Sequence, residues 1–238
     1  MLEKPLGEIG PFKRPKKPRR IPTVLNPDEI QNLFAQLHGM HSLMIRLMYG
    51  TGMRVMECVR LRILDLDFPY RQIIVRESKG KKDRVVPMPN VLLDSLQKQV
   101  KRVEQLHQKD IDAGFGTVFL PEALARKYPN AERELRWQYL FPASRLAQNP
   151  RTGIMHRHHI HQSAIQKAIK QAATKAKILK RVTTHTCRHS FATHLLETGS
   201  DIRTVQELLG HANVETTMIY THVVKRGGTG TKSPLDRL

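Results

Sequence analysis

Apolar side chains recur at helical spacing along the first part of the chain. Asn26 can cap a helix, Pro27 suits the first helical position, and Glu29 completes a capping box. The apolar residues that follow fall on one helical face, namely Ile30, Leu33, Phe34 and Leu37. The pattern predicts an amphipathic helix that begins at Asn26.

Two more helices are predicted directly afterwards. The stretch 41–49 has a second apolar helical face, and Gly50 and Gly52 are expected to break it. Arg54 stands near the start of a third helix, whose apolar members are Val55, Cys58 and Val59.

The next segment contains two short stretches that are typical of β-strands. Residues 72–76 and 84–88 are rich in Ile and Val, and the basic stretch 78–83 separates them. This arrangement predicts a β-hairpin with a basic tip. Asn90 is then expected to cap a long helix, whose apolar positions are Leu93, Leu96, Val100 and Val103.

Residues 110–160 are irregular and interrupted by glycine and proline. Helical patterns return afterwards, at about 165–172, 187–197, 202–209 and 215–222. The predicted fold class is therefore mainly α, of the α+β type, with a helical core and a small antiparallel β-sheet.

Charge is the feature of the composition that changes this picture. The 238 residues carry 40 Lys and Arg against 21 Asp and Glu, a formal net charge of +19. Such an excess predicts a polyanionic partner, and nucleic acid fits better than a membrane surface because no long basic amphipathic helix dominates. The two cysteines, Cys58 and Cys187, are too few for a disulfide framework or a four-cysteine zinc site, and both are expected to be reduced. With no signal region and no membrane span, we expect a cytoplasmic, DNA-associated protein of a bacterium.

Residues 1–22 combine repeated proline with a run of positive charge. Proline and mutual repulsion favour an extended segment. It is interpreted as a linker that follows a DNA backbone, with a solvated tail as the alternative. Its candidate DNA-binding residues are Lys13, Arg14, Lys16, Lys17, Arg19 and Arg20.

Three motifs together resemble the signature of tyrosine recombinases. Residues 184–193 read Thr-His-Thr-Cys-Arg-His-Ser-Phe-Ala-Thr and are similar to the start of the second signature box. Residues 208–211 and 217–222 resemble the end of that box, and residues 49–54 resemble the first box. The resemblance covers residues 23–238, which it implies are one catalytic domain.

The resemblance implies a phosphate-binding set that works without metal or cofactor. Arg54 and Arg188 are expected to grip the scissile phosphate, with Glu57 supporting the site from behind. Lys79, at the hairpin tip, is the expected general acid for the departing 5′ oxygen, and Lys81 and Lys82 are its rivals. Both neighbours are also candidate DNA contacts.

The same resemblance implies the nucleophile and its helpers. Tyr220 is expected to attack phosphorus and form a 3′-phosphotyrosyl link that needs no ATP to be rejoined. The arginines are expected to lower the cost of forming its phenolate. His185 resembles the general base and His211 a hydrogen-bond donor to the phosphate. The other histidines are read as structural, among them His38, His41, His107, His189, His194 and His222.

One branch of the family is favoured. Residues 120–129, within an insertion at about 110–160, and residues 227–235 resemble integron integrases, which recombine gene cassettes. By resemblance, Trp137 stacks on an extrahelical base of a folded single-stranded hairpin, while Pro150, His158 and His159 hold another. Trp137 as an anchor of the insertion is the alternative. A zinc site in the histidine cluster 156–161 is disfavoured by irregular spacing.

The family also implies an assembly. Four protomers are expected on two duplex DNA sites, with the segment after Tyr220 docking on a neighbour. The chain begins at the linker, so the N-terminal core-binding domain of the family is expected to be absent. Two alternatives therefore stay open: a Xer-type or phage-type recombinase, and a DNA-binding module without catalysis.

Overall fold

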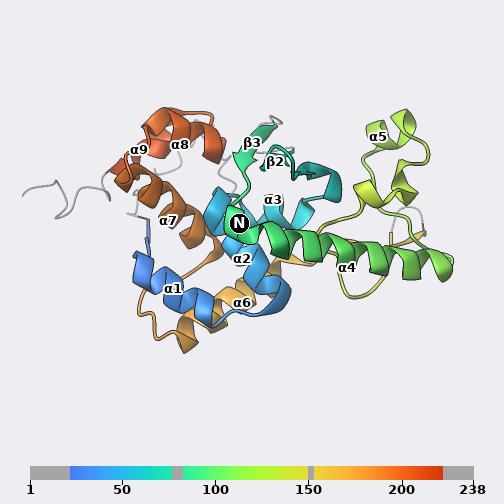
Figure 1. Ribbon diagram of the computed structural model, residues 1–238, viewed down its shortest axis with the longest axis horizontal. Coiled ribbons are helices and arrows are strands. Elements are labelled where there is room, and N and C mark those ends of the chain that lie inside the picture. The colour runs from blue at the N-terminus through green and yellow to red at the C-terminus, as the bar shows by residue number, and fades with distance from the viewer. Residues whose placement is uncertain (1–21, 77–82, 150–152, 222–238) are drawn as a thin grey trace, which may run out of the picture.

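The computed structural model describes residues 22–76, 83–149 and 153–221. Helices dominate the described part (Figure 1). They are α1 (Pro27–Ala35), α2 (Gly39–Thr51), α3 (Val55–Arg60), α4 (Leu93–Asp112), α5 (Glu122–Lys127), α6 (Gln162–Lys175), α7 (Thr184–Glu197), α8 (Ile202–Leu209) and α9 (Val214–Met218). The strands are β1 (Leu66–Asp67), β2 (Gln72–Val75), β3 (Arg84–Pro87), β4 (Ala147–Gln148) and β5 (Met155–His156). None of the helices described is long and apolar enough to cross a membrane.

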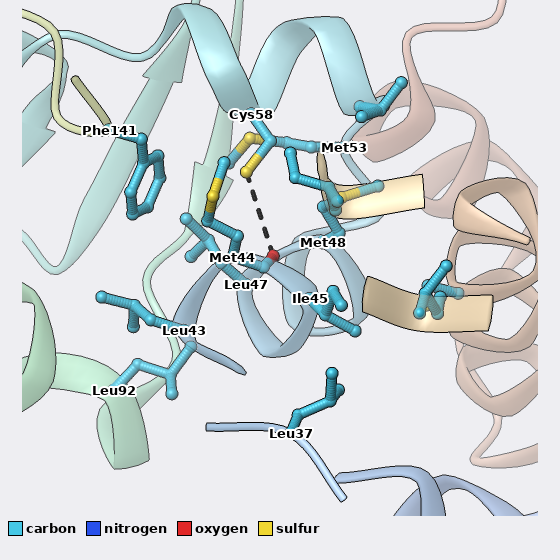
Figure 2. Close-up of a cluster of buried hydrophobic side chains, with 14 of the residues drawn as sticks. Leu37, Leu43, Met44, Ile45, Leu47, Met48, Met53, Cys58, Leu92 and Phe141 are labelled. Atoms are coloured by element: carbon cyan, nitrogen blue, oxygen red, sulfur yellow. Dashed lines mark hydrogen bonds between the residues drawn. The ribbon is translucent and has the colours of Figure 1, made fainter. Parts of the chain in front are cut away.

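Helix α2 is the centre of the fold. It packs against α7, α6 and α3, and α1 packs on α6 beneath it (Figure 1). The apolar faces predicted from the sequence meet there in one buried cluster, part of which Figure 2 shows. Cys58 lies in that cluster, where its Sγ is 3.9 Å from the backbone oxygen of Met44. Both cysteines are free and buried, as expected, and burial raises the pKa of both thiols.

The start of α1 confirms the predicted capping box. Asn26 Oδ1 accepts from the Glu29 backbone, and Glu29 Oε2 accepts from the Asn26 backbone, each at 2.8 Å. Glu29 also pairs with Lys180 at 2.6 Å. The reciprocal bonds satisfy two groups that a helix start leaves without helical partners, so this boundary is determined locally.

The end of α2 differs from the sequence prediction. The helix runs through Gly50 to Thr51, and Gly52 ends it with a left-handed φ of 67°. A Cβ at Gly52 would lie 2.5 Å from Phe191 Cδ1 and 2.9 Å from Leu209 Cδ2. Gly52 is therefore needed both for its backbone angle and for the close approach of α7 and α8.

The predicted hairpin is confirmed and has a third strand. The sheet order is β1-β2-β3, all antiparallel, with Ile73 opposite Val86. Both of these side chains are buried, and β3 also packs against α8. The hairpin tip, with Lys79, Lys81 and Lys82, lies outside the described residues.

The predicted cap of α4 is wrong. Asn90 opens a 3₁₀ turn, Asn90–Leu92, and α4 begins only at Leu93. The Asn90 side chain instead accepts from Arg71 Nη1 at 3.3 Å. Near the other end of the chain, α7 starts at Thr184 rather than at 187, and α9 stops at Met218 rather than at 222.

The insertion has a small core of its own. Val118, Leu120, Ala131 and Tyr139 are buried together beside α5, with Trp137 packed against them. The insertion also holds the antiparallel pair β4 and β5. Arg157 Nη2 donates to Asp110 Oδ1 at 2.6 Å, which ties the insertion to the end of α4. Pro150 lies outside the described residues.

Candidate active site

The carboxylate of Glu57 is the point where the candidate residues converge. Arg54 is the N-cap of α3, one turn before Glu57. Its Nη1 donates to Glu57 Oε1 at 2.7 Å, and its backbone donates to Oε2 at 2.8 Å. Arg54 and Glu57 thus pair across one helical turn, so local geometry orients this arginine.

Arg84, which sequence reasoning missed, binds the other side of the same carboxylate. It is the first residue of β3 and donates to Glu57 Oε2 at 2.6 Å and Oε1 at 3.1 Å. Its Nε also donates to the backbone oxygen of Leu208 at 2.7 Å. The side chain is only 8% exposed. The sequence held one signal, an arginine in a strand otherwise made of Val and Pro, and that signal is weak.

Arg188 joins the ends of two helices. Its Nη1 donates to the backbone oxygen of Gly52 at 2.7 Å, and its Nη2 donates to that of Leu209 at 2.6 Å. Its Nη1 lies 4.0 Å from Glu57 Oε2. Burial, followed by the charge of Arg54, lowers the pKa of Arg188 to about 10, so it stays charged at neutral pH. Three guanidinium groups thus surround one carboxylate, and the net positive charge suits an anionic ligand.

Glu57 makes the stability of the fold depend on pH. Burial raises its pKa, but hydrogen bonds and charge from Arg84, with help from Arg54, hold it at about 2, below the ordinary 4.5. A depressed carboxyl pKa stabilises the fold above the ordinary value and loses that contribution as pH falls through the folded value. The difference corresponds to about 3 kcal/mol at neutral pH.

We therefore expect Glu57→Gln to flatten the acid limb of stability. As the pH drops from about 5 to about 2, the wild-type free energy of unfolding should fall more steeply than that of the variant. This range covers the ordinary pKa of the carboxyl group and the lower pKa of Glu57 in the fold. Urea unfolding at a series of pH values measures the difference. Asp28→Asn, on the exposed start of α1, serves as the control. Parallel curves for wild type and Glu57→Gln would show that the arginines do not hold this carboxyl ionised.

Tyr220 lies just beyond α9 and is enclosed. It is 1% exposed and packs in a cluster with Phe191, Val205 and Leu209. Its ring stacks on that of His211 at 6.5 Å between centroids. Its hydroxyl lies 2.9 Å from His189 Nδ1, so His189, predicted to be only structural, contacts the candidate nucleophile.

The net effect of the site on Tyr220 is opposite to the expectation. Burial raises the pKa of Tyr220, while the charges of Arg188 and Arg54 act in the expected direction and lower it. Burial is the larger effect because the phenolate loses water that the two arginines do not fully replace.

The two predicted histidines flank this arrangement. His211 Nδ1 lies 2.9 Å from Thr217 Oγ1, and burial with the charges of Arg188 and Arg54 lowers its pKa to about 4. His185 is exposed on α7, one turn before His189, with ring centroids 6.4 Å apart. Burial, then Arg188 and Arg54, lowers the pKa of His185. Both environments therefore favour the neutral form of the ring.

A cleft of about 390 Å³ runs from this cluster to the insertion. Its lining includes Arg54 and Glu57 at the site, Arg60 and Arg62, and a set of rings from the insertion, namely Phe119, Trp137, Tyr139, His158 and His159. Arg62 Cζ lies 4.5 Å from the centre of the Tyr139 ring and 5.9 Å from that of Trp137. Three of the predicted base-binding residues therefore border the same cleft as the predicted phosphate-binding arginine.

Trp137 also has the packing that its alternative role requires. It contacts the insertion core and lies 6.1 Å from Tyr128, measured between ring centroids. The ring centroids of His158 and His159 lie 4.0 Å apart. Burial lowers the pKa of both histidines, that of His159 to about 4. Neutral rings of this kind present flat faces without charge. The predicted DNA-binding residues of the tail lie outside the described part of the chain.

Comparison with known proteins gives one consistent picture. The model of the phage integrase family matches residues 23–226. Proteins named integrase/recombinase from Escherichia coli and Pseudomonas aeruginosa are each 50% identical over 233 residues, which is 98% of this chain and 68% of theirs. The tyrosine recombinase XerD of Staphylococcus saprophyticus is 35% identical over 221 residues, covering 90% of this chain and 62% of that protein.

Solved structures agree on the fold. The XerA recombinase is 32% identical with a TM-score of 0.60, over 88% of this chain and 62% of that one. The catalytic domain of bacteriophage HP1 integrase is 21% identical with a TM-score of 0.51, and the match covers 89% of this chain and 99% of that domain. The chain thus spans about two thirds of the longer relatives and nearly the whole of an isolated catalytic domain.

Proposed function

Because this chain belongs to the phage integrase family, we propose that it cleaves and rejoins DNA strands through a covalent link to Tyr220. The observation that supports this most directly is the convergence on one site of Arg54, Arg188, His211 and the Tyr220 hydroxyl, all from separate elements. In the proposed reaction Arg54 and Arg188 hold the nonbridging oxygens of a phosphodiester. Tyr220 attacks phosphorus, and the 5′ oxygen leaves with a proton from Lys79.

The enclosed position of Tyr220 adds a condition to this proposal. A side chain that is 1% exposed meets a DNA phosphate only after the surrounding cluster opens. The Gly52 and Gly210 turns and the short α9 border that cluster, whereas Arg54 and Glu57 lie on α3 outside it. We infer that DNA docks first on Arg54, whose side chain is 24% exposed, and that Tyr220 engages afterwards.

The experiment that tests this function uses a nicked suicide substrate. After strand cleavage the small fragment diffuses away, so the covalent intermediate accumulates and survives denaturant. An adduct that forms in the presence of chelator supports the proposal. A protein that binds DNA but gives no adduct would favour the alternative of a binding module without catalysis.

The finer proposal concerns the substrate. We infer an integron-type function, in which the cleft receives an extrahelical base of a folded cassette hairpin. The rings of Trp137, His158 and His159 border the cleft that Arg54 also borders, so a base and its neighbouring phosphate fit at opposite ends. Duplex sites and a tetramer on DNA complete this proposal. A Xer-type or phage-type function on plain duplex DNA is the alternative.

Trp137→Ala separates these substrates. We expect it to weaken binding to a hairpin with an extrahelical base by roughly 10-fold to 100-fold, as loss of one stacked base would. Binding to a plain duplex should stay unchanged. Trp137→Phe, which keeps an aromatic face, is the matched control in a fluorescence anisotropy titration. Equal weakening on both DNA forms would instead assign Trp137 to anchoring the insertion.

A further inference from the structure

The Tyr220 hydroxyl contacts His189, a histidine that has no role in the reaction proposed above. His189 Nδ1 lies 2.9 Å from Tyr220 Oη, with the two ring centroids 5.6 Å apart. This is hydrogen-bonding distance, and it is the hydrogen bond that the described residues show for this hydroxyl. A nucleophile and a histidine in such contact form the arrangement from which a proton transfer starts.

On this basis we propose that His189 is the proton acceptor for Tyr220 and that this contact is kept when the cluster opens onto DNA, a proposal that rests on the strand cleavage proposed above. As Tyr220 Oη forms its bond to phosphorus, the hydroxyl proton passes to His189 Nδ1. The bond from phosphorus to the 5′ oxygen breaks, and that oxygen takes a proton from a separate acid. In rejoining, a 5′ hydroxyl gives its proton back to that acid and displaces the phenolic oxygen, and His189 returns the proton to Tyr220 Oη.

The position of His189 on α7 supports this role. It directly follows Arg188, whose guanidinium is fixed by the backbone oxygens of Gly52 and Leu209. The helix backbone therefore holds the proton acceptor and the proposed phosphate ligand at a constant separation. Such fixed placement of reacting groups is a main source of catalytic rate.

The position of His185 assigns it a different task. It lies one helical turn earlier, and its ring centroid is 6.4 Å from that of His189. It is exposed, and the charges of Arg188 and Arg54 act on it. His189 is thus the histidine of α7 that contacts the nucleophile, and His185 is left free to contact a phosphate oxygen.

The ionisation of His189 is compatible with proton acceptance. Burial, then the charges of His185 and Arg188, lowers its pKa to about 4, so the ring is neutral at pH 7 and can accept. The charged and titratable groups around it are His185 and Arg188 on α7, Tyr220 after α9, and His211 in the preceding loop. A bound phosphate adds negative charge beside these groups and raises the basicity of the ring as the reaction needs it.

His189→Asn provides the test. The Asn oxygen takes the place of Nδ1 and can accept a hydrogen bond, but it cannot take up a proton. We expect adduct formation on the suicide substrate to slow by about 10²-fold to 10⁴-fold, the usual contribution of a general base. The matched control is His194→Asn, because His194 Nδ1 makes the same kind of bond, 2.8 Å to Tyr49 Oη, on the same helix. This control should cleave at close to the wild-type rate.

A second substrate identifies which proton His189 handles. When sulfur replaces the bridging 5′ oxygen, the leaving group departs without needing an acid. The defect of His189→Asn should persist on this substrate, because the proton of Tyr220 still needs an acceptor. A rate restored by sulfur would place His189 at the leaving group and overturn the proposal.

Two further outcomes are decisive. If His189→Asn cleaves as fast as wild type or faster, the hydrogen bond only holds Tyr220 in its enclosed position. The role of His189 then fails, while strand cleavage stands. If wild type and His194→Asn also form no adduct, strand cleavage itself fails and the role of His189 fails with it.

Discussion

Tyr220→Phe is expected to abolish the covalent adduct with DNA and leave DNA binding intact. The substitution removes a single oxygen, and the ring keeps its packing against Phe191 and Leu209. The phenylalanine ring has no oxygen to attack phosphorus, so the proposed covalent link cannot form. The loss should be complete within detection on a nicked suicide substrate, whereas the mobility shift of the noncovalent complex should persist.

Tyr49→Phe is the matched control for this result. Tyr49, on α2, also has its hydroxyl in hydrogen-bonding contact with a histidine of α7, at 2.8 Å from His194 Nδ1. It should therefore cost little stability and leave the adduct unchanged, with or without chelator. An adduct that survives Tyr220→Phe would place the nucleophile elsewhere and remove the basis of the proposed function.

Arg188→Ala is expected to give the largest loss of stability together with loss of cleavage. Arg188 is 4% exposed, and its removal leaves the carbonyl oxygens of Gly52 and Leu209 without their partner. Breaking such a buried charged network costs about 3–5 kcal/mol. The urea midpoint should fall accordingly, and no adduct should form under conditions where the variant is folded.

Arg188→Lys separates charge from geometry. One ammonium group cannot hold both carbonyl oxygens as the planar fork does, so we expect an intermediate loss of stability and a strong loss of cleavage. Arg203→Ala, at an exposed position on α8, is the control and should match wild type in both measurements. Full cleavage by Arg188→Lys would contradict a bidentate role for this side chain.

Features set by neighbours along the chain were predictable from the sequence. The capping box of Asn26 and Glu29 and the pairing of Arg54 with Glu57 both depend on a spacing of three residues, and both are present. Helical periodicity likewise located the buried face of α2. The predicted cap at Asn90 failed because its side chain finds Arg71 across the sheet, a partner that no local rule includes.

The candidate site likewise contains residues that short motifs predicted and residues that only long-range contacts revealed. The signature motifs predicted Arg54, His185, Arg188, His211 and Tyr220. The structure places Arg54 and Arg188 at the Glu57 carboxylate and stacks the His211 ring on that of Tyr220. Arg84 escaped notice because its bonds to Glu57 and Leu208 join positions far apart in the chain. His189 was read as structural because adjacent histidines in a helix look alike until a third element approaches one of them.

The sequence by itself determined the helical and strand pattern, the basic character of the chain, and the family to which its motifs belong. These follow from residue type and short spacing, which act before the chain is folded. Only the tertiary structure decided which histidine meets Tyr220, that burial outweighs two arginines at its hydroxyl, and that the insertion shares a cleft with Arg54. Loss of water and long-range contact have no counterpart in spacing, because both arise only when distant segments pack together.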